Sequence, residues 1–276
     1  ARLFIHDNGT GLAEGFDPAS HELVVRGDFN GWTGSLLQPV DGNIYSVTVE
    51  ANGTPGSPVQ WKFGANPSEF YLNGGWELGM NRKFMFPAGD TTLAVELPNI
   101  YTSGKSIAEA RALGVGRVVR TKGIITSYNF GAGYTEYTMQ DTSAGIVLFA
   151  PEIELPVGFR DRVVVEGRIT EYNGKMEIVP ESFDGNPENV VWIVDHGVPV
   201  PQEQLLTIPE ILASPEDYES ELVRIGQAVI TDGTWPLEGN NTNLTIMDQA
   251  GGSLVMRIDK ETDIDGSPPP SDSFAV

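Results

Sequence analysis

Short apolar runs separated by turn-forming residues characterise the first third of the chain. Apolar and polar side chains alternate within each run, which is the pattern of a strand with one buried face. Gly, Pro, Asn and Asp interrupt the runs at intervals of roughly ten residues. This spacing predicts an antiparallel β-sandwich over residues 1–98. The predicted strands are Arg2–His6, Glu22–Gly27, Asn43–Glu50, Val59–Gly64, Lys83–Phe86 and Thr92–Leu97.

The pattern changes after the short joint Asn99–Gly104, which is too brief to separate two domains and predicts that they touch. Ser106–Leu113 has apolar residues at helical spacing between a Ser and Gly114, which predicts one short helix. Five strands follow, and their number and length predict a small closed barrel of the oligonucleotide/oligosaccharide-binding (OB) type over residues 99–198. These strands are Arg117–Tyr128, Tyr134–Asp141, Gly145–Phe149, Asp161–Tyr172 and Lys175–Pro180.

A repeat of domain length links this barrel to the last third of the chain. Ile107–Ala110 is echoed by Ile208–Ile211, and Tyr137–Asp141 by Thr245–Asp248, at spacings of 101 to 107 residues. Residues 199–276 are therefore predicted to form a second OB-like barrel, apparently truncated. Two explanations stay open: the natural protein continues beyond Val276, or a neighbouring molecule completes the barrel by strand addition.

The composition changes the picture in three ways. The chain has no cysteine, which excludes disulfides, zinc-thiolate sites and thiol catalysis. It has no apolar run long enough to predict a membrane span. The lack of cysteine and a start at Ala1 rather than Met fit a processed, exported bacterial protein, so an extracellular or cell-surface location is expected.

The formal net charge is −21, and residues 199–276 alone carry 14 acidic against 3 basic residues. Such a field repels phosphate backbones, so no nucleic-acid partner is predicted. Solubility and a salty habitat would both explain the acidity, and the sequence does not separate them. Residues 99–198 contain aromatic and basic side chains of the kind that bind single strands, yet 13 acidic residues outnumber 9 basic ones there. These aromatics are predicted to pack the barrel: Tyr128, Phe130, Tyr134, Tyr137 and Tyr172, near Arg117, Arg120, Lys122 and Arg168.

Several motifs of the first domain match a known family. They are Gly27-Asp28-Phe29-Asn30-Gly31-Trp32, Asp41-Gly42-Asn43-Ile44-Tyr45, Trp61-Lys62-Phe63, Trp76-Glu77 and Asn81-Arg82. Together they resemble the starch-binding domain of glucoamylases and related secreted bacterial modules. The resemblance implies an immunoglobulin-like, starch-binding-type sandwich.

It also implies a glycan site. Trp32 and Trp76 would form a platform for consecutive glucose units, with Lys62 and Asn81 bonding hydroxyls at its edge. Aromatic faces suit the C–H faces of sugars, and amides suit their hydroxyls. Such shallow sites bind with micromolar to millimolar affinity, about −8 to −4 kcal/mol. The alternative is that these loops serve packing and that Trp76 caps the sandwich.

Metal and catalytic signals are weak. No cofactor is required, but alternate acidic residues before Gly266 could hold a structural calcium ion at Glu261, Asp263 and Asp265; a solvated acidic turn is the competing interpretation. The three histidines lack metal-ligand spacing, and there is no nucleophile elbow, phosphate loop or dinucleotide fingerprint. The chain is therefore predicted not to be an enzyme.

Three functions remain open. The first is a non-catalytic extracellular modular protein that binds an α-glucan-like glycan. The second is a structural subunit of a surface layer or filament, self-associating or joined to a neighbouring chain by strand addition. The third is an accessory region of a secreted hydrolase or nuclease, since the tandem OB-like modules resemble those of secreted bacterial multidomain proteins.

Overall fold

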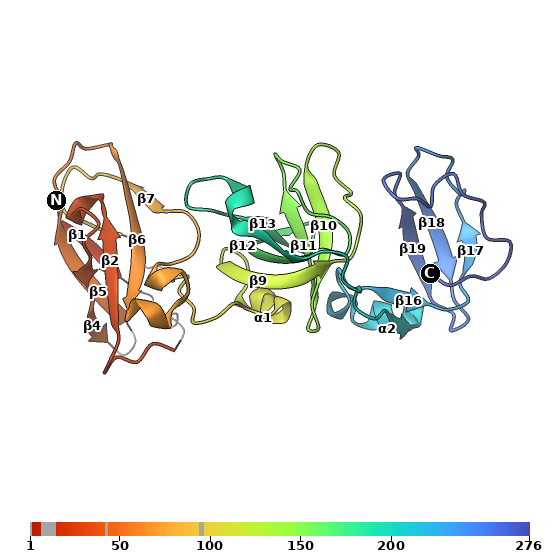
Figure 1. Ribbon diagram of the computed structural model, residues 1–276, viewed down its shortest axis with the longest axis horizontal. Coiled ribbons are helices and arrows are strands. Elements are labelled where there is room, and N and C mark those ends of the chain that lie inside the picture. Colours follow the sequence, from red (N-terminus) through yellow and green to blue (C-terminus); the bar gives the residue numbers. More distant parts are fainter. Residues whose placement is uncertain (1, 7–14, 42–43, 94–96) are drawn as a thin grey trace.

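Three β units follow one another along the long axis of the molecule (Figure 1). The computed structural model describes residues 2–6, 15–41, 44–93 and 97–276. The units are an N-terminal sandwich (residues 2–98), a central barrel (99–198) and a C-terminal unit (199–276). Strands dominate all three, which confirms the predicted all-β class.

The N-terminal sandwich consists of two four-stranded sheets, with strand orders β4-β5-β1-β8 and β3-β2-β6-β7. Alternate residues of β2 and β6, such as Val25 and Phe63, pack against Tyr45 and Val49 of β5, so the core lies between the sheets. The strands are β1 Arg2–His6, β2 Glu22–Gly27, β3 Ser35–Leu36, β4 Gln38–Asp41, β5 Ile44–Glu50, β6 Pro58–Asn66, β7 Arg82–Met85 and β8 Thr91–Thr92.

Three single-turn helices complete this unit: η1 Asp28–Asn30, η2 Ser68–Phe70 and η3 Leu72–Gly75. The predicted strand Thr92–Leu97 runs into residues 94–96, which lie outside the described residues, as does the turn at Gly42–Asn43. Of that strand the structure describes Thr92, which belongs to β8 and pairs with Phe4 of β1.

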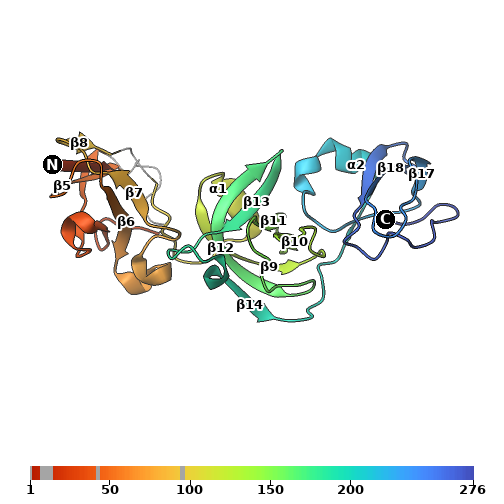
Figure 2. The ribbon, with the colours of Figure 1, turned by 90° about the horizontal axis from the view of Figure 1, so that it is seen from above.

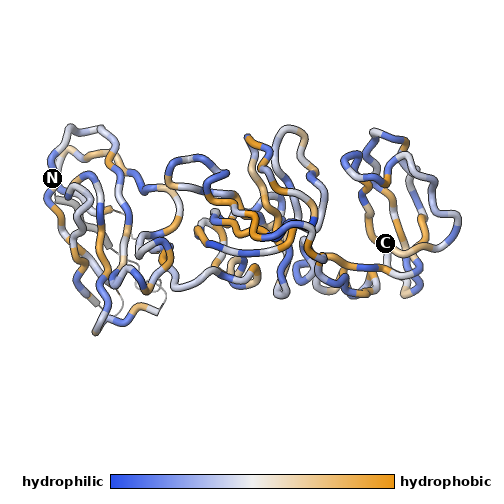
Figure 3. Tube along the Cα trace, in the orientation of Figure 1, coloured by the Kyte–Doolittle hydropathy of each residue, from blue (hydrophilic) through white to orange (hydrophobic). Residues whose placement is uncertain are grey.

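The central barrel is a closed ring of five strands, in which β9 pairs with β10, β10 with β11, β11 with β13, β13 with β12, and β12 with β9. Apolar residues concentrate on these strands (Figure 3). The sequence did not predict β14, which lies outside the ring beside β12 (Figure 2). The elements are α1 Ile107–Leu113, β9 Val118–Ile125, β10 Thr135–Gln140, β11 Gly145–Ala150, β12 Arg162–Tyr172, β13 Lys175–Pro180, η4 Pro187–Val190 and β14 Val191–Asp195.

The C-terminal unit contains a three-stranded sheet, β17-β18-β19, and a parallel pair, β15-β16. Phe274 forms an isolated antiparallel bridge with Ala228, and Val276 exchanges two backbone hydrogen bonds with Ile225. No ring of strands closes within residues 199–276. The elements are β15 Gln204–Leu206, α2 Ile208–Ala213, η5 Pro215–Asp217, β16 Val223–Ile225, β17 Val229–Asp232, β18 Thr242–Met247 and β19 Ser253–Ile258.

The sandwich and the barrel are joined by direct contacts. Leu78 of the sandwich is 2% exposed and belongs to the core of the barrel. The backbone N–H groups of Gly79 and Met80 donate to Glu166 Oε1 at 3.3 Å and Glu181 Oε1 at 3.0 Å, both carboxylates of the barrel. The contact expected from the short joint is therefore present.

Candidate functional site

The structure brings the two predicted platform tryptophans together. The ring centroids of Trp32 and Trp76 are 6.1 Å apart, and the rings are inclined by 41°. Trp32 Nε1 donates to Asp28 Oδ1 at 3.1 Å. The guanidinium of Arg26 lies 4.4 Å from the centre of the Trp76 ring and covers part of one face.

The two polar residues predicted to bind sugar are placed differently. Lys62 is 5% exposed, and its Nζ donates to the carbonyls of Glu77, at 3.1 Å, and Gly79. Burial lowers the pKa of this amine. Asn81 donates to Gln60 Oε1 at 2.9 Å. The expectation for Lys62 is thus corrected, because a buried ammonium bonded to main-chain carbonyls does not face a ligand.

The segment Trp76–Arg82 has a structural role that the motif did not reveal. Glu77 is 1% exposed, accepts the N–H of Phe63 at 3.0 Å and pairs with Arg82 at 2.8 Å. The residues that follow it contact the central barrel, as described above. Since a buried carboxylate needs partners, this pair and Lys62 hold the loop in the shape that reaches the barrel.

Two of the acidic residues predicted to bind calcium contact separate partners. Glu261 pairs with Lys260 at 2.8 Å, and Asp265 accepts the N–H of Gly239. Within the described residues, no group of three or more His, Asp or Glu side chains is placed to hold a metal ion. Calcium at Glu261, Asp263 and Asp265 stays an untested prediction.

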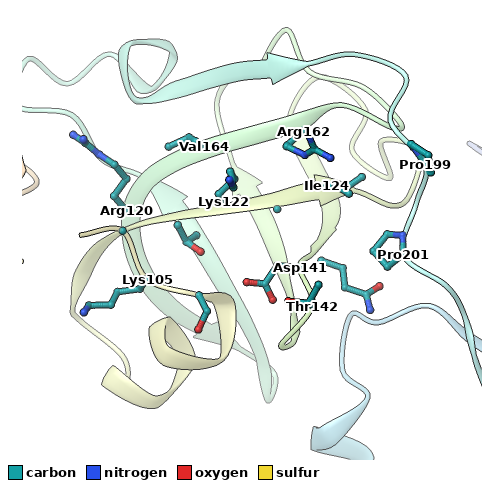
Figure 4. A pocket seen from close by; sticks show the side chains of 15 residues that line it. Lys105, Arg120, Lys122, Ile124, Asp141, Thr142, Arg162, Val164, Pro199 and Pro201 are labelled. Carbon is teal, nitrogen blue, oxygen red and sulfur yellow. The ribbon is translucent and has the colours of Figure 1, made fainter. Parts of the chain in front are cut away.

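A cleft of about 660 Å³ lies on the central barrel (Figure 4). It lies between β9, the segment 104–106, the end of β10, the start of β12 and the linker prolines Pro199 and Pro201. Four cationic side chains line it, and we call it the basic groove: Lys105, Arg120, Lys122 and Arg162.

The strand period explains how these cations come together. Along β9, Val119, Thr121 and Gly123 are buried, so Arg120 and Lys122 face outward. Arg162 stands beside Ile124 in the neighbouring strand β12. Two strands with matching register therefore present their cations on one face of the sheet.

Two of these cations contact neighbouring acidic or aromatic side chains. Arg120 Nη2 lies 2.9 Å from Glu166 Oε2, and its guanidinium lies 5.3 Å from the centre of the Trp192 ring. Arg162 Nη1 lies 3.7 Å from Asp195 Oδ2 in a more exposed pair. Because exposed pairs are weak, Arg162 can exchange its partner for a ligand at little cost.

The single carboxylate among the lining residues is already engaged. Asp141 accepts the N–H groups of Ile107 at 2.9 Å, Ser143 at 2.7 Å and Ala144 at 3.1 Å, and the hydroxyl of Ser143 at 2.6 Å. These bonds stabilise its negative charge locally. Among the residues that line the groove, four cations therefore face one carboxylate.

A concave surface lined by four cations can attract anionic ligands. One comparison with known proteins finds a relative in part of the chain. The chain is 30% identical, over 165 residues, to Endonuclease YhcR of Bacillus subtilis (strain 168). The match covers 58% of the chain but 13% of that protein, so the chain spans a small part of its length.

The other comparisons do not define a family. No protein-family model matches the chain. An aspartyl-tRNA synthetase structure from Leishmania major Friedlin matches at 14% identity and a TM-score of 0.27, covering 36% of this chain and 22% of that one. A structure described as "Structural mimicry for functional antagonism" matches at 10% identity and a TM-score of 0.29, covering 64% and 91%. Both scores are too low to identify a shared fold.

The likeness to a protein named an endonuclease corrects two expectations, that the chain is not an enzyme and that nucleic acid is not a partner. The second error has a physical reason. Net charge averages over a whole domain, whereas a ligand meets the local field of the few side chains that surround it. Among the described residues, none of the helices is long and apolar enough to cross a membrane.

Proposed function

We propose that the chain is a nucleic-acid-binding region of an endonuclease-like protein, and that the basic groove holds the phosphate backbone. The observation that carries this proposal is the gathering of four cations around one cleft in a chain with a net charge of −21. The whole chain has 17 basic and 38 acidic residues, so random placement does not favour four basic side chains around one cleft. The likeness to Endonuclease YhcR supports the choice of nucleic acid among polyanions.

The groove binds chiefly by releasing counterions from the backbone. Lys105, Lys122 and Arg162 supply charge, and Arg120 adds a planar group that can donate two parallel bonds to a phosphate. The acidic remainder of the chain opposes the approach of a polyanion. Binding is therefore expected to be weak and strongly dependent on salt.

A salt titration tests this proposal. Fluorescence anisotropy of a labelled oligonucleotide would give the dissociation constant at increasing salt. Four phosphate contacts predict that log K falls against log salt with a slope of about −3 for single strands. An absence of binding at low salt, or an affinity independent of salt, would overturn the proposal.

Export belongs to the same proposal. A chain of 276 residues without cysteine is compatible with an oxidising extracellular environment. Fractionation of the native host, with the chain detected by antibody, would place it in the medium and envelope or in the cytosol. Recovery in the cytosol alone would contradict export.

One observation favours a second candidate, glycan binding at the sandwich. Trp32 has a φ of 64°, a left-handed conformation that costs free energy in a bulky residue, and it sits 6.1 Å from Trp76. The burial of Lys62 and the Arg26 contact reduce the polar and aromatic surface left for sugar. Maltoheptaose should quench tryptophan fluorescence and Trp76→Ala should remove the response; no quenching at millimolar sugar would exclude this candidate.

A further inference from the structure

We infer that the basic groove selects single-stranded over double-stranded nucleic acid, because an exposed tryptophan on β14 offers its bases a stacking surface. This inference rests on the proposed function. It names the substrate class of the same groove and adds a residue, Trp192, that does not line the cleft itself.

Strand register places Trp192 beside the cations. Lys122 of β9 pairs with Val164 of β12, and Val164 pairs in turn with Trp192 of β14. Residues directly opposite one another in antiparallel strands project to the same face of the sheet. Lys122, Val164 and Trp192 therefore form one row across three strands, with the charge at one end and the ring at the other.

The ring is both accessible and supported. Trp192 is 41% exposed, and Val194, two residues further along β14, is 56% exposed. The guanidinium of Arg120 lies 5.3 Å from the ring centre and is itself held by Glu166. A cation against an aromatic ring restrains it at an exposed site. Arg120 thus covers part of one face of Trp192, and the other face is the surface on which a base would stack.

A single strand can use this platform and a duplex cannot do so without being opened. Unpaired bases expose faces that stack on aromatic rings, while the backbone follows a positive groove. In a duplex the base faces are covered by neighbouring base pairs, so the protein meets phosphates and groove edges. The cations attract both single strands and duplexes, whereas Trp192 adds affinity for single strands alone.

The test compares three ligands and four variants of the full chain. Labelled oligothymidylate, oligouridylate and a duplex of equal length are titrated by anisotropy at low salt. Trp192→Ala is expected to weaken single-strand binding by about 5- to 100-fold and duplex binding by less than about twofold. Trp192→Phe should retain most of the single-strand affinity. Trp192→Leu preserves apolar bulk without a ring and should behave as Trp192→Ala does.

Phe183→Ala is the matched control, since Phe183 is an aromatic residue of the same barrel that is 74% exposed and lies away from the groove lining. It should leave both affinities unchanged. If the wild-type chain binds strands and duplexes equally and Trp192→Leu changes neither, the stacking inference is overturned while the groove function stands. If the wild-type chain binds no nucleic acid at low salt, the proposed function itself fails. Oligothymidylate and oligouridylate separate DNA from RNA as the source of the strand.

Discussion

The central barrel and the C-terminal unit share one local framework. In both, a capping box begins a short helix: Ser106 and Glu109 in the first, Thr207 and Glu210 in the second. In both, an aspartate at the end of a strand accepts the first helical N–H. Ile107 donates to Asp141 at 2.9 Å, and Ile208 donates to Asp248 at 2.7 Å.

The two units differ in the groove that this framework supports. The C-terminal unit has a smaller cleft, about 330 Å³, at the corresponding place beside Thr207, Gly226 and Asp248. No cation lines it, and Glu210 and Asp248 do. Leu206 and Gly226 stand where the central barrel has Lys105 and Lys122. The framework thus builds a cleft, and a few side chains decide whether it attracts a polyanion.

The two units also differ at the strand that borders the cleft. In the central barrel Arg162 pairs with Ile124. In the C-terminal unit Phe274 bridges Ala228, and its side chain packs against the small core of that unit. The equivalent position therefore contributes charge to one cleft and core packing to the other.

Charge reversal in the central groove should have the largest effect. Lys122→Glu combined with Arg162→Glu is expected to lower oligonucleotide affinity by about 100-fold or more at low salt, because two attractive phosphate contacts become repulsive. Anisotropy titrations measure the change. Both side chains lie at the surface, so thermal unfolding should remain close to that of the wild type.

The C-terminal unit supplies the control for net charge. Arg224→Glu with Arg257→Glu changes the total charge by the same amount, and both arginines are 53% exposed in surface ion pairs. This variant should lose much less affinity for nucleic acid than the groove double variant, since neither arginine lines the groove. Equal losses in the two double variants would show that the whole-chain field, and not the groove, governs binding.

Removing the shared aspartates should produce a smaller effect, on stability. Asp248→Ala leaves the N–H groups of Ile208 and Gly252 without their carboxylate partner and should cost about 1–3 kcal/mol. Asp141→Ala should cost a similar amount in the central barrel. Hydrogen exchange of the α2 and α1 amides would measure the two losses separately.

The consequences of these two losses should differ. The core cluster of the C-terminal unit contains only the buried residues Ile208, Ile225, Ala228 and Ile246, whereas that of the barrel extends over all five ring strands. The same loss should therefore open the C-terminal unit at a temperature where the barrel stays folded. Simultaneous unfolding of both units in Asp248→Ala would mean that the joint between them couples their stability.

Much of the framework could be predicted from sequence. The strands of the central barrel and the helix α1 follow from alternation and from the Ser106 and Gly114 boundaries, and the structure has them within a few residues. The groove could not be predicted in the same way. Arg120 and Lys122 were named only among the basic residues of the predicted barrel, and Arg162 joins them through strand register, which depends on contacts distant in sequence.

At the candidate site of the sandwich, the sequence motif located the residues but did not reveal the role of each one. The motif placed Trp32 and Trp76 close together, yet Lys62 and Glu77 turned out to be buried. A polar residue in a motif loop can face a ligand or satisfy the backbone of a neighbouring loop, and its residue type is the same in both cases. For Lys62, its burial and its bonds to the carbonyls of Glu77 and Gly79 identify the second role.

Transfer of the missing cations should have the smallest effect and is the sharpest test of the comparison. Leu206→Lys with Gly226→Lys places two lysines in the C-terminal cleft. The backbone allows this at Gly226, where an added Cβ would meet only Leu205 Cδ1 at 4.0 Å. In the Lys122→Glu, Arg162→Glu variant, the two added lysines should raise oligonucleotide affinity by about 3- to 10-fold. The gain is small because Glu210, Asp248 and the acidic unit around them repel the oligonucleotide. No recovery would mean that a closed ring of strands is needed as well as charge, since it fixes the outward row on which the cations and Trp192 stand.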